Sequence, residues 1–473
     1  MEYAEALKRG FSIGEHSCSR SLFGLRKSQV IGESVSVILA FAALLSVGSL
    51  AGLLIFALVV TLASVAFLVG YKGTTLDRMI LALLAQANGG LVQGRHGYRH
   101  DLHGFSVEPN RSLFIASSHS WGSRRISSSR KRSPAGVRPQ LGGVELRSLR
   151  EVQLDGGSTL GVARERRGAK RGVLAYELFG EGFLLRDRQD QLSVATIFGT
   201  MLGSLGSRSN SVESIVLLYL VDPGQAGDSG ASAFGWAEEV RTLYNEVHDK
   251  AVSRRCYLII RMEDAGISER GYLELDTFVS SLGLRYKALD GSSLAGLFTF
   301  GTGERSERGV LHMRSKWGHL LVGERLMKLF DVAELPTGEI GPDFLVPFVT
   351  SLECESLLSF RFKAIESHLA LKKVRARRSG ITADAGIRAL LGFLARNSET
   401  RAISSLELQE NDLDMGYEMF SVTGHFALFA DSLYELKEVA QAAVAKAEKS
   451  GLVLECAYGR QLQARRQLFG SPG

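Results

Sequence analysis

The chain has 473 residues and a formal net charge of +6. Its composition, 45% hydrophobic and 22% charged, excludes a disordered or collagen-like chain. Its four cysteines, Cys18, Cys256, Cys354 and Cys456, lie too far apart for a disulfide scaffold or a CxxC metal knuckle. The length allows two or three domains with a sizeable core.

A stretch of 38 residues from Ser34 to Tyr71 contains no charged side chain. As one helix it would be about 57 Å long, roughly twice the hydrocarbon core of a bilayer. We therefore expect a transmembrane hairpin of two helices, at about 34–49 and 53–71, with a turn at Gly48, Ser49 and Gly52. A buried hairpin in a soluble core is the alternative.

Basic residues flank this stretch on both sides, which predicts a two-pass protein of the cytoplasmic (inner) membrane with both termini cytoplasmic. Residues 1–90 are then an N-terminal tail, the hairpin and a juxtamembrane helix that begins near Thr75. The flanking cations are Lys8, Arg9, Arg20, Arg26 and Lys27 before the stretch, and Lys72, Arg78, Arg95 and Arg99 after it.

Residues 91–145 form a Ser/Arg-rich connector without an acidic residue between Pro109 and Val144. Such a segment is attracted to the anionic headgroups of a lipid bilayer. A solvated loop and a nucleic-acid contact remain as alternatives. The predicted membrane-surface residues are Arg124, Arg125, Arg130, Lys131 and Arg132.

Residues 146–325 have the pattern of a first α+β unit. Strands are expected at 146–154, 159–166, 172–179, 212–221 and 256–262. Helices are expected from about Asp187, at about 231–252 and near 273–282.

Residues 326–473 predict a second α+β unit, a ferredoxin-like split β-α-β with an inserted helical arm at about 367–406. We expect its strands at 327–335, 357–365, 417–429 and 452–458, and a short helix from near Pro342. The arm should break at Gly380-Ile381-Thr382, and Asp431 should cap the last helix, which ends at Gly451. The predicted fold class is thus α+β, a transmembrane hairpin followed by cytoplasmic α/β units.

Sequence signatures of catalysis are missing. There is no Gly-Lys dipeptide, hence no phosphate loop, and neither G-x-S-x-G nor H-E-x-x-H occurs. His96, His100 and His103 are close in sequence, but the glycines around them favour a polar loop over a metal site. We therefore predict a protein that is not an enzyme, with no catalytic residue, cofactor or metal.

The C-terminal third resembles the two-helix membrane proteins of actinobacterial conjugation and type IV secretion-like clusters. The residues that carry the resemblance are 340–348 (IGPDFLVPF), 420–424 (FSVTG) and 456–461 (CAYGRQ). In that family a membrane hairpin joins a part similar to the nucleotide-free half of the large secretion ATPase. The resemblance implies a non-catalytic membrane subunit that couples a separate cytosolic ATPase, which carries the phosphate loop, to other inner-membrane channel subunits. A homo-oligomer is possible, and direct DNA contact stays open.

Two surfaces are the candidate partner-binding sites. One is the segment with Gly341, Pro342, Asp343 and Phe344; the other is the basic face of the arm, with Lys372, Lys373, Arg375 and Arg378. A packing turn and a solvated helix are the respective alternatives. The second functional hypothesis is a membrane-anchored cytoplasmic sensor or scaffold with a ligand-binding α/β domain, which a cavity in the first unit would favour.

Overall fold

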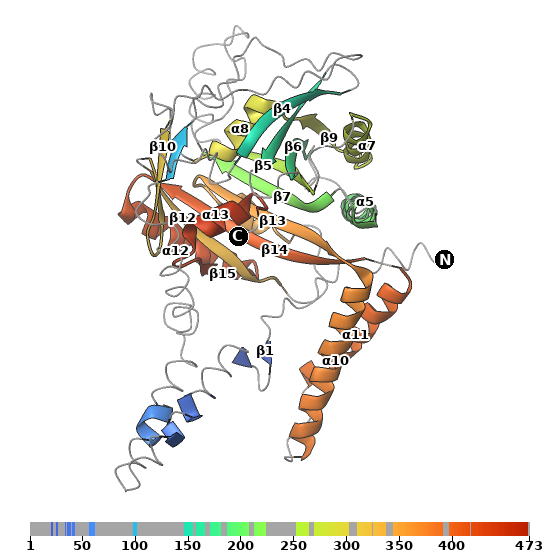
Figure 1. Ribbon diagram of the computed structural model, residues 1–473, viewed down its shortest axis with the longest axis vertical. Coiled ribbons are helices and arrows are strands. Elements are labelled where there is room, and N and C mark those ends of the chain that lie inside the picture. Colours follow the sequence, from blue (N-terminus) through green and yellow to red (C-terminus); the bar gives the residue numbers. More distant parts are fainter. Residues whose placement is uncertain are drawn as a thin grey trace.

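The computed structural model centres on one continuous antiparallel sheet (Figure 1). It describes residues 98–101, 146–154, 158–165, 171–180, 187–207, 212–223, 252–263, 269–301, 310–323, 325–336, 344–390, 397–416 and 418–471, with short pieces at 20–21, 25–26 and within 34–61. Thirteen of the described strands belong to the sheet.

Two halves of the sheet repeat the same order of elements. The first is β6 (Gly172–Phe179), α5 (Arg188–Ser207), β7 (Val212–Asp222), β8 (Ser253–Met262), α7 (Glu269–Ser280) and β9 (Arg285–Ala288). The second is β12 (Arg325–Glu334), α9 (Val346–Ser351), β13 (Ser356–Ile365), β14 (Met419–Ala430), α12 (Leu433–Lys449) and β15 (Val453–Cys456). The strands lie in the orders β9-β6-β8-β7 and β15-β12-β14-β13. Each half is thus a split β-α-β arrangement.

The two halves meet along β7 and β13, which pair antiparallel from Ser356↔Val221 to Phe362↔Ile215. Both strands are rich in apolar residues, and β7 is buried along most of its length, as expected for a strand covered on both faces. Strands β7 and β13 are the corresponding edge strands of the two halves, so each half contributes the same edge to the join. The pairing makes the two halves one hydrogen-bonded body.

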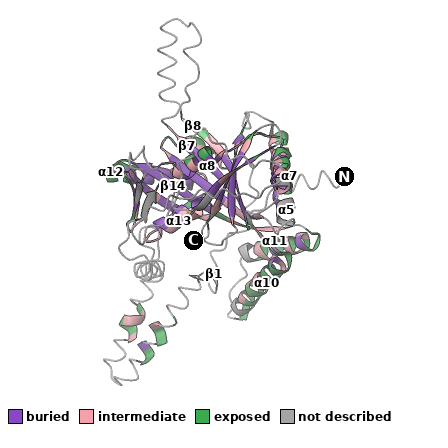
Figure 2. Cartoon of the chain, turned by 45° about the horizontal axis from the view of Figure 1, so that its top comes forward, coloured by how far each residue is buried: buried purple, intermediate pink, exposed green. Residues whose placement is uncertain are grey.

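Helices cover both faces of the sheet. The helices α5, α7, α9 and α12 contribute to apolar clusters on one face, where Leu217 and Phe360 lie opposite each other across the join. The helices α8 (Gly291–Thr299) and α13 (Gln461–Leu468) cover the other face. That second cluster includes residues of both halves, such as Val216 and Leu329. Figure 2 shows the buried residues of all these clusters in purple at the centre of the molecule.

The C-terminal helix α13 and the residues after it clasp the two halves together. Phe469 makes an edge-to-face contact with Phe298 of α8, with ring centroids 5.0 Å apart. The carbonyl oxygen of Phe469 and the hydroxyl of Ser471 accept hydrogen bonds from Arg261 of β8, at 3.4 and 3.3 Å. Gly470, at φ +78°, leaves no room for a Cβ beside Val216 and Arg261.

The remaining strands extend the sheet at its two ends. On the first half lie β4 (Leu146–Gln153) and β5 (Thr159–Glu165); on the second lie β10 (Val310–Ser315), β11 (Leu320–Val322) and β3 (Tyr98–Asp101). Strand β3 comes from the predicted connector and includes His100, paired with Leu311. The connector thus supplies part of the sheet.

The predicted fold class is wrong in two respects. It placed separate α/β units one after the other, whereas one antiparallel sheet runs through both because β7 and β13 pair across the predicted boundary. It also placed a transmembrane hairpin at the N-terminus. In the part of the chain that the structure describes, no helix is long and apolar enough to cross a membrane. Most of 34–49 and 53–71, and the helix expected after Thr75, lie outside the described residues.

Several predicted element boundaries also change. The arm helix α10 (Ser367–Leu390) runs unbroken through Gly380-Ile381-Thr382, and a second helix, α11 (Asn397–Asp414), follows. The short helix begins at Val346 rather than near Pro342. Ser432, not Asp431, caps α12, because its hydroxyl accepts the Glu435 N–H at 3.2 Å. The helix expected at 231–252 lies outside the described residues, and α8, β9, β10, β11 and α13 were not predicted.

Candidate functional site

The helical arm, α10 and α11, is inserted between the neighbouring strands β13 and β14 and projects away from the sheet (Figure 1). Its two helices are held together by a small apolar cluster of Ala370, Val374, Leu406 and Leu413. Much of the remaining arm surface is exposed, as the green ribbon of Figure 2 shows. The arm therefore contributes little to the main core, so stability of the sheet does not account for its length.

Charge is segregated between the two helices of the arm. Helix α10 carries six Lys and Arg and one acid, whereas α11 carries five acids and one Arg. Asp412 and Asp414 stand near the C-terminus of α11, and no basic residue lies in its last turn. The helix dipole disfavours anions at that end, so intrinsic helix stability does not explain the pattern. The charges instead suit contacts between helices.

Two of the four predicted arm cations are used inside the arm. Arg375 Nε donates to Glu410 Oε1 at 2.7 Å, and Arg378 Nη1 lies 2.7 Å from Glu410 Oε2. The hydrogen bond from Arg375 lowers the pKa of the Glu410 carboxyl below its usual value. The sequence reasoning missed Glu410, although an acid on the returning helix of a hairpin is the signal that could have found it. Arg375 and Arg378 therefore join α10 to α11.

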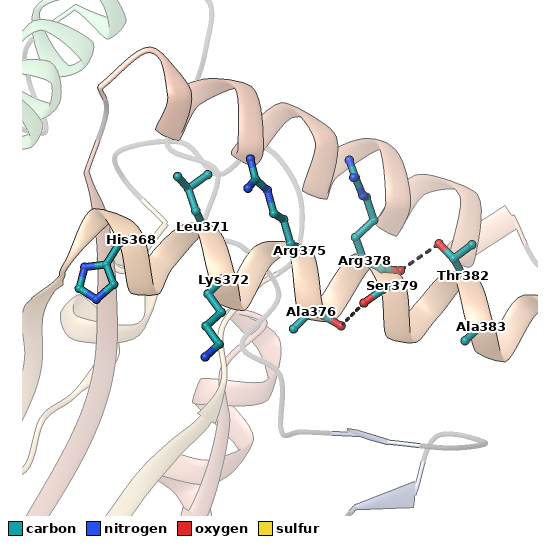
Figure 3. A pocket seen from close by; sticks show the side chains of 9 residues that line it. All are labelled: His368, Leu371, Lys372, Arg375, Ala376, Arg378, Ser379, Thr382 and Ala383. Carbon is teal, nitrogen blue, oxygen red and sulfur yellow. Dashed lines mark hydrogen bonds between the residues drawn. The ribbon is translucent and has the colours of Figure 1, made fainter.

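The other two predicted cations, Lys372 and Lys373, are exposed. Lys372 belongs to an open groove of about 1020 Å³ along α10. Figure 3 shows Arg375 and Arg378 pointing toward the neighbouring helix, while Lys372, Ala376 and Ala383 point the other way. The groove is lined by His368, Leu371, Lys372, Arg375, Ala376, Arg378, Ser379, Thr382 and Ala383.

Most of the other predicted partner segment, residues 341–344, lies outside the described residues. Gly341, Pro342 and Asp343 lie outside the described residues, as do Arg124, Arg125, Arg130, Lys131 and Arg132 of the connector. Phe344 is partly buried and packs against the apolar cluster that contains Phe348 and Leu436. The structure therefore gives Phe344 a packing role, and it does not bring Phe344 together with the arm cations in one site.

A partly buried polar cluster on β12 and β14 is a second candidate, for acid/base chemistry. Asp331 Oδ1 lies 3.0 Å from His425 Nδ1, and Arg460 Nη2 donates to Asp331 Oδ2 at 2.5 Å. Burial by itself raises the pKa of the Asp331 carboxyl. The hydrogen bond from His425 and the charge of Arg460 outweigh burial and bring this pKa below its usual value. The nearby hydroxyl of Ser359 donates to the His425 carbonyl oxygen at 3.5 Å, not to the ring. This arrangement fits a structural charge cluster.

Cysteine and metal chemistry gain no support from the described residues. Burial raises the pKa of Cys256 to about 12 and those of Cys354 and Cys456 to about 11, so these thiols are protonated at neutral pH. Within the described residues, His, Cys, Asp and Glu form no group that could hold a metal ion.

Comparison with known proteins adds no family to this picture. Neither a protein-family model nor a curated protein matches the sequence.

Proposed function

We propose that the chain is a non-catalytic assembly subunit that couples a separate ATPase to a translocation machine of the type IV secretion kind. The arm is the observation that supports this proposal. A charge-segregated helical hairpin of 24 and 18 residues leaves the sheet and buries little of its own surface. Ordering a long, exposed helical hairpin costs conformational entropy. Contacts between the arm and a partner would offset this cost.

The chemistry of the arm favours an acidic protein segment as the partner. Lys372 and Lys373 are exposed in the first half of α10, where they can meet carboxylates. The two helices together carry seven Lys and Arg and six acids, which is too little net positive charge for the many phosphate contacts of a nucleic acid. The proposed partner surface is therefore a segment of the ATPase that presents Asp or Glu.

The sensor hypothesis has less support. A ligand-binding domain needs a hollow lined by apolar and a few polar groups. The groove described above lies on the arm, whereas the apolar cluster of the first half packs against its helices through residues such as Leu160, Leu174 and Val279. Localisation at the membrane, with both termini cytoplasmic, stays a prediction from the uncharged stretch and its basic flanks.

A paired charge reversal tests the proposal. The tagged full-length chain is purified from native membranes in mild detergent, and the co-purifying chains are identified by mass spectrometry. We expect Lys372→Glu with Lys373→Glu to lose a phosphate-loop ATPase that the wild type recovers. Lys437→Glu with Lys449→Glu, an equal charge change at exposed positions of α12, should keep it. Equal recovery by both double variants would contradict the proposal.

A further inference from the structure

Helix α11 presents large apolar side chains away from its partner helix. Leu408 is 63% exposed and Met415, just after the helix, is 62% exposed. The buried residues Leu406 and Leu413 face α10 in the arm cluster. Two residues along a helix turn the side chain by about 200°, so Leu408 and Met415 point outward. The outer face of α11 therefore carries two unpartnered apolar side chains among the described residues.

The groove on α10 is a hollow lined in part by small side chains, whereas the outer face of α11 carries large ones. The small residues Ala376, Ser379 and Ala383 line the groove from its middle to the end farther from the sheet, and His368 and Lys372 line the end nearer the sheet. The Ser379 hydroxyl already donates to the Ala376 carbonyl oxygen at 3.1 Å, which leaves a surface of low polarity at this point. A hollow with small side chains is suited to a large apolar side chain from another helix.

The two surfaces match in spacing and in charge. Ala376 and Ala383 are seven residues apart, and so are Leu408 and Met415. Seven residues are two helical turns, about 10.5 Å, so both apolar residues can contact the groove at once. The acids Glu407 and Asp414 adjoin Leu408 and Met415, and α10 is the basic helix of the arm. Electrostatic attraction therefore favours the same pairing.

We propose that α11 of one copy packs into the α10 groove of a second copy, with Leu408 and Met415 over the stretch that holds Ala376, Ser379 and Ala383. This inference rests on the proposed function in taking the arm as the assembly element. Because the groove and the apolar face belong to different helices of one arm, the contact is head-to-tail. Each arm can then contact two neighbours, and such a contact closes into a ring when the rotation between copies allows it.

Disulfide trapping between separate full-length preparations tests the contact. Ser379→Cys protein is mixed with Leu408→Cys protein and oxidised. We expect a cross-linked dimer of the two, because the contact brings these positions together. The matched control is Lys373→Cys mixed with Leu408→Cys, since Lys373 is on the same helix but does not line the groove. The wild type shows the background from its native cysteines. Equal cross-linking in both mixtures, or none in either, would overturn the inference.

Molar mass in solution gives the second readout. Leu408→Glu with Met415→Glu should weaken self-association about tenfold or more, because two apolar contacts are replaced by charges. Both positions are exposed, so the arm should keep its fold. A wild-type monomer, or an oligomer that the double variant leaves unchanged, would contradict the contact. A third variant, Ser379→Trp, fills the groove. If the wild type is a monomer and Ser379→Trp no longer recovers the ATPase, the groove binds the ATPase. That result would overturn the inference and leave the proposed function standing.

Discussion

Glu410 of α11 accepts a hydrogen bond from Arg375 of α10 over 2.7 Å and also pairs with Arg378. This one carboxylate ties the two helices of the arm together beyond the small apolar cluster near its base. It also divides the basic residues of α10 by role. Arg375 and Arg378 hold the arm in shape, while Lys372 and Lys373 stay exposed for a partner.

Neutralising Glu410 should loosen the arm without affecting the sheet. In Glu410→Gln, we expect faster amide hydrogen exchange in α11, because two guanidinium groups lose their anionic partner. The exchange of β13 and β14 should not change. Glu407→Gln, an exposed neighbour, is the matched control and should leave α11 as in the wild type. Equal exchange in both variants would show that the pairing does not hold the arm.

The same carboxylate predicts the response of the arm to pH. The Glu410 pKa is lowered in the folded arm, so its contribution is present above the usual Glu pKa of about 4.3 and is lost as pH falls through the lower folded value. Exchange-competent opening of α11, measured by mass spectrometry with rates corrected for intrinsic exchange, should therefore rise in acid. In Glu410→Gln this acid dependence should largely disappear. An acid dependence that survives in the variant would contradict this assignment.

The polar cluster under α13 should matter for global stability. Asp331→Asn leaves Arg460 and His425 without a carboxylate, which should lower the free energy of unfolding by about 1–3 kcal/mol at neutral pH. Since the Asp331 pKa is lowered, the loss should shrink as pH falls below the usual Asp value of about 3.9. Urea unfolding at two pH values measures it. Glu438→Gln, exposed on α12, is the control, and a difference that does not depend on pH would contradict the charge cluster.

Two glycines near α8 should respond in opposite ways to alanine. A Cβ at Gly161 would lie 2.7 Å from the Asp290 carbonyl carbon and the Gly291 nitrogen, so Gly161→Ala should cost about 1–3 kcal/mol. A Cβ at Gly296, inside α8, meets nothing within 4 Å, so Gly296→Ala should stabilise by about 0.5–1 kcal/mol. Chemical unfolding of both variants checks the pair. Equal effects would contradict the close approach of β5 to α8.

The C-terminal clasp should hold the two halves in one unfolding unit. Phe469 is fully buried against Phe298, so Phe469→Ala should cost about 3–5 kcal/mol. We also expect the halves to unfold less cooperatively, visible as a broader calorimetric transition. Leu433→Ala, at a position 50% exposed, should change stability by no more than about 0.5 kcal/mol. A small effect of Phe469→Ala on both stability and cooperativity would contradict this role for Phe469.

Local patterns in the sequence predicted many of the strands. The range 172–179 matches β6, and 212–221 matches β7 within one residue, because continuous apolar runs bounded by turns have few other structures available. The joining of β7 to β13 could not be predicted in this way. The paired residues Leu218 and Ser359 are far apart in sequence, and neither strand alone indicates its partner.

Helix α13 was missed for a different physical reason. Its sequence, QLQARRQL, is polar, yet Gln461 and Arg465 are fully buried. Gln461 Oε1 accepts the Leu329 N–H at 2.9 Å, and Arg465 Nη2 donates to the Phe298 carbonyl oxygen at 3.2 Å. Backbone groups from distant segments thus satisfy both side chains. A hydrophobic pattern does not record partners of this kind, and the same limit hid Glu410 as the partner of Arg375 and Arg378.

The most direct test of the account is to identify what touches the arm in the cell. A photo-reactive phenylalanine analogue replaces Lys373, which is exposed on α10, and the cross-linked chain is identified by mass spectrometry. The same analogue at Lys449 of α12 is the control. The account predicts a cross-link from position 373 alone to an acidic segment of a chain with a phosphate loop. Cross-links from position 373 only to lipid, to nucleic acid or to the same chains as from position 449 would contradict it.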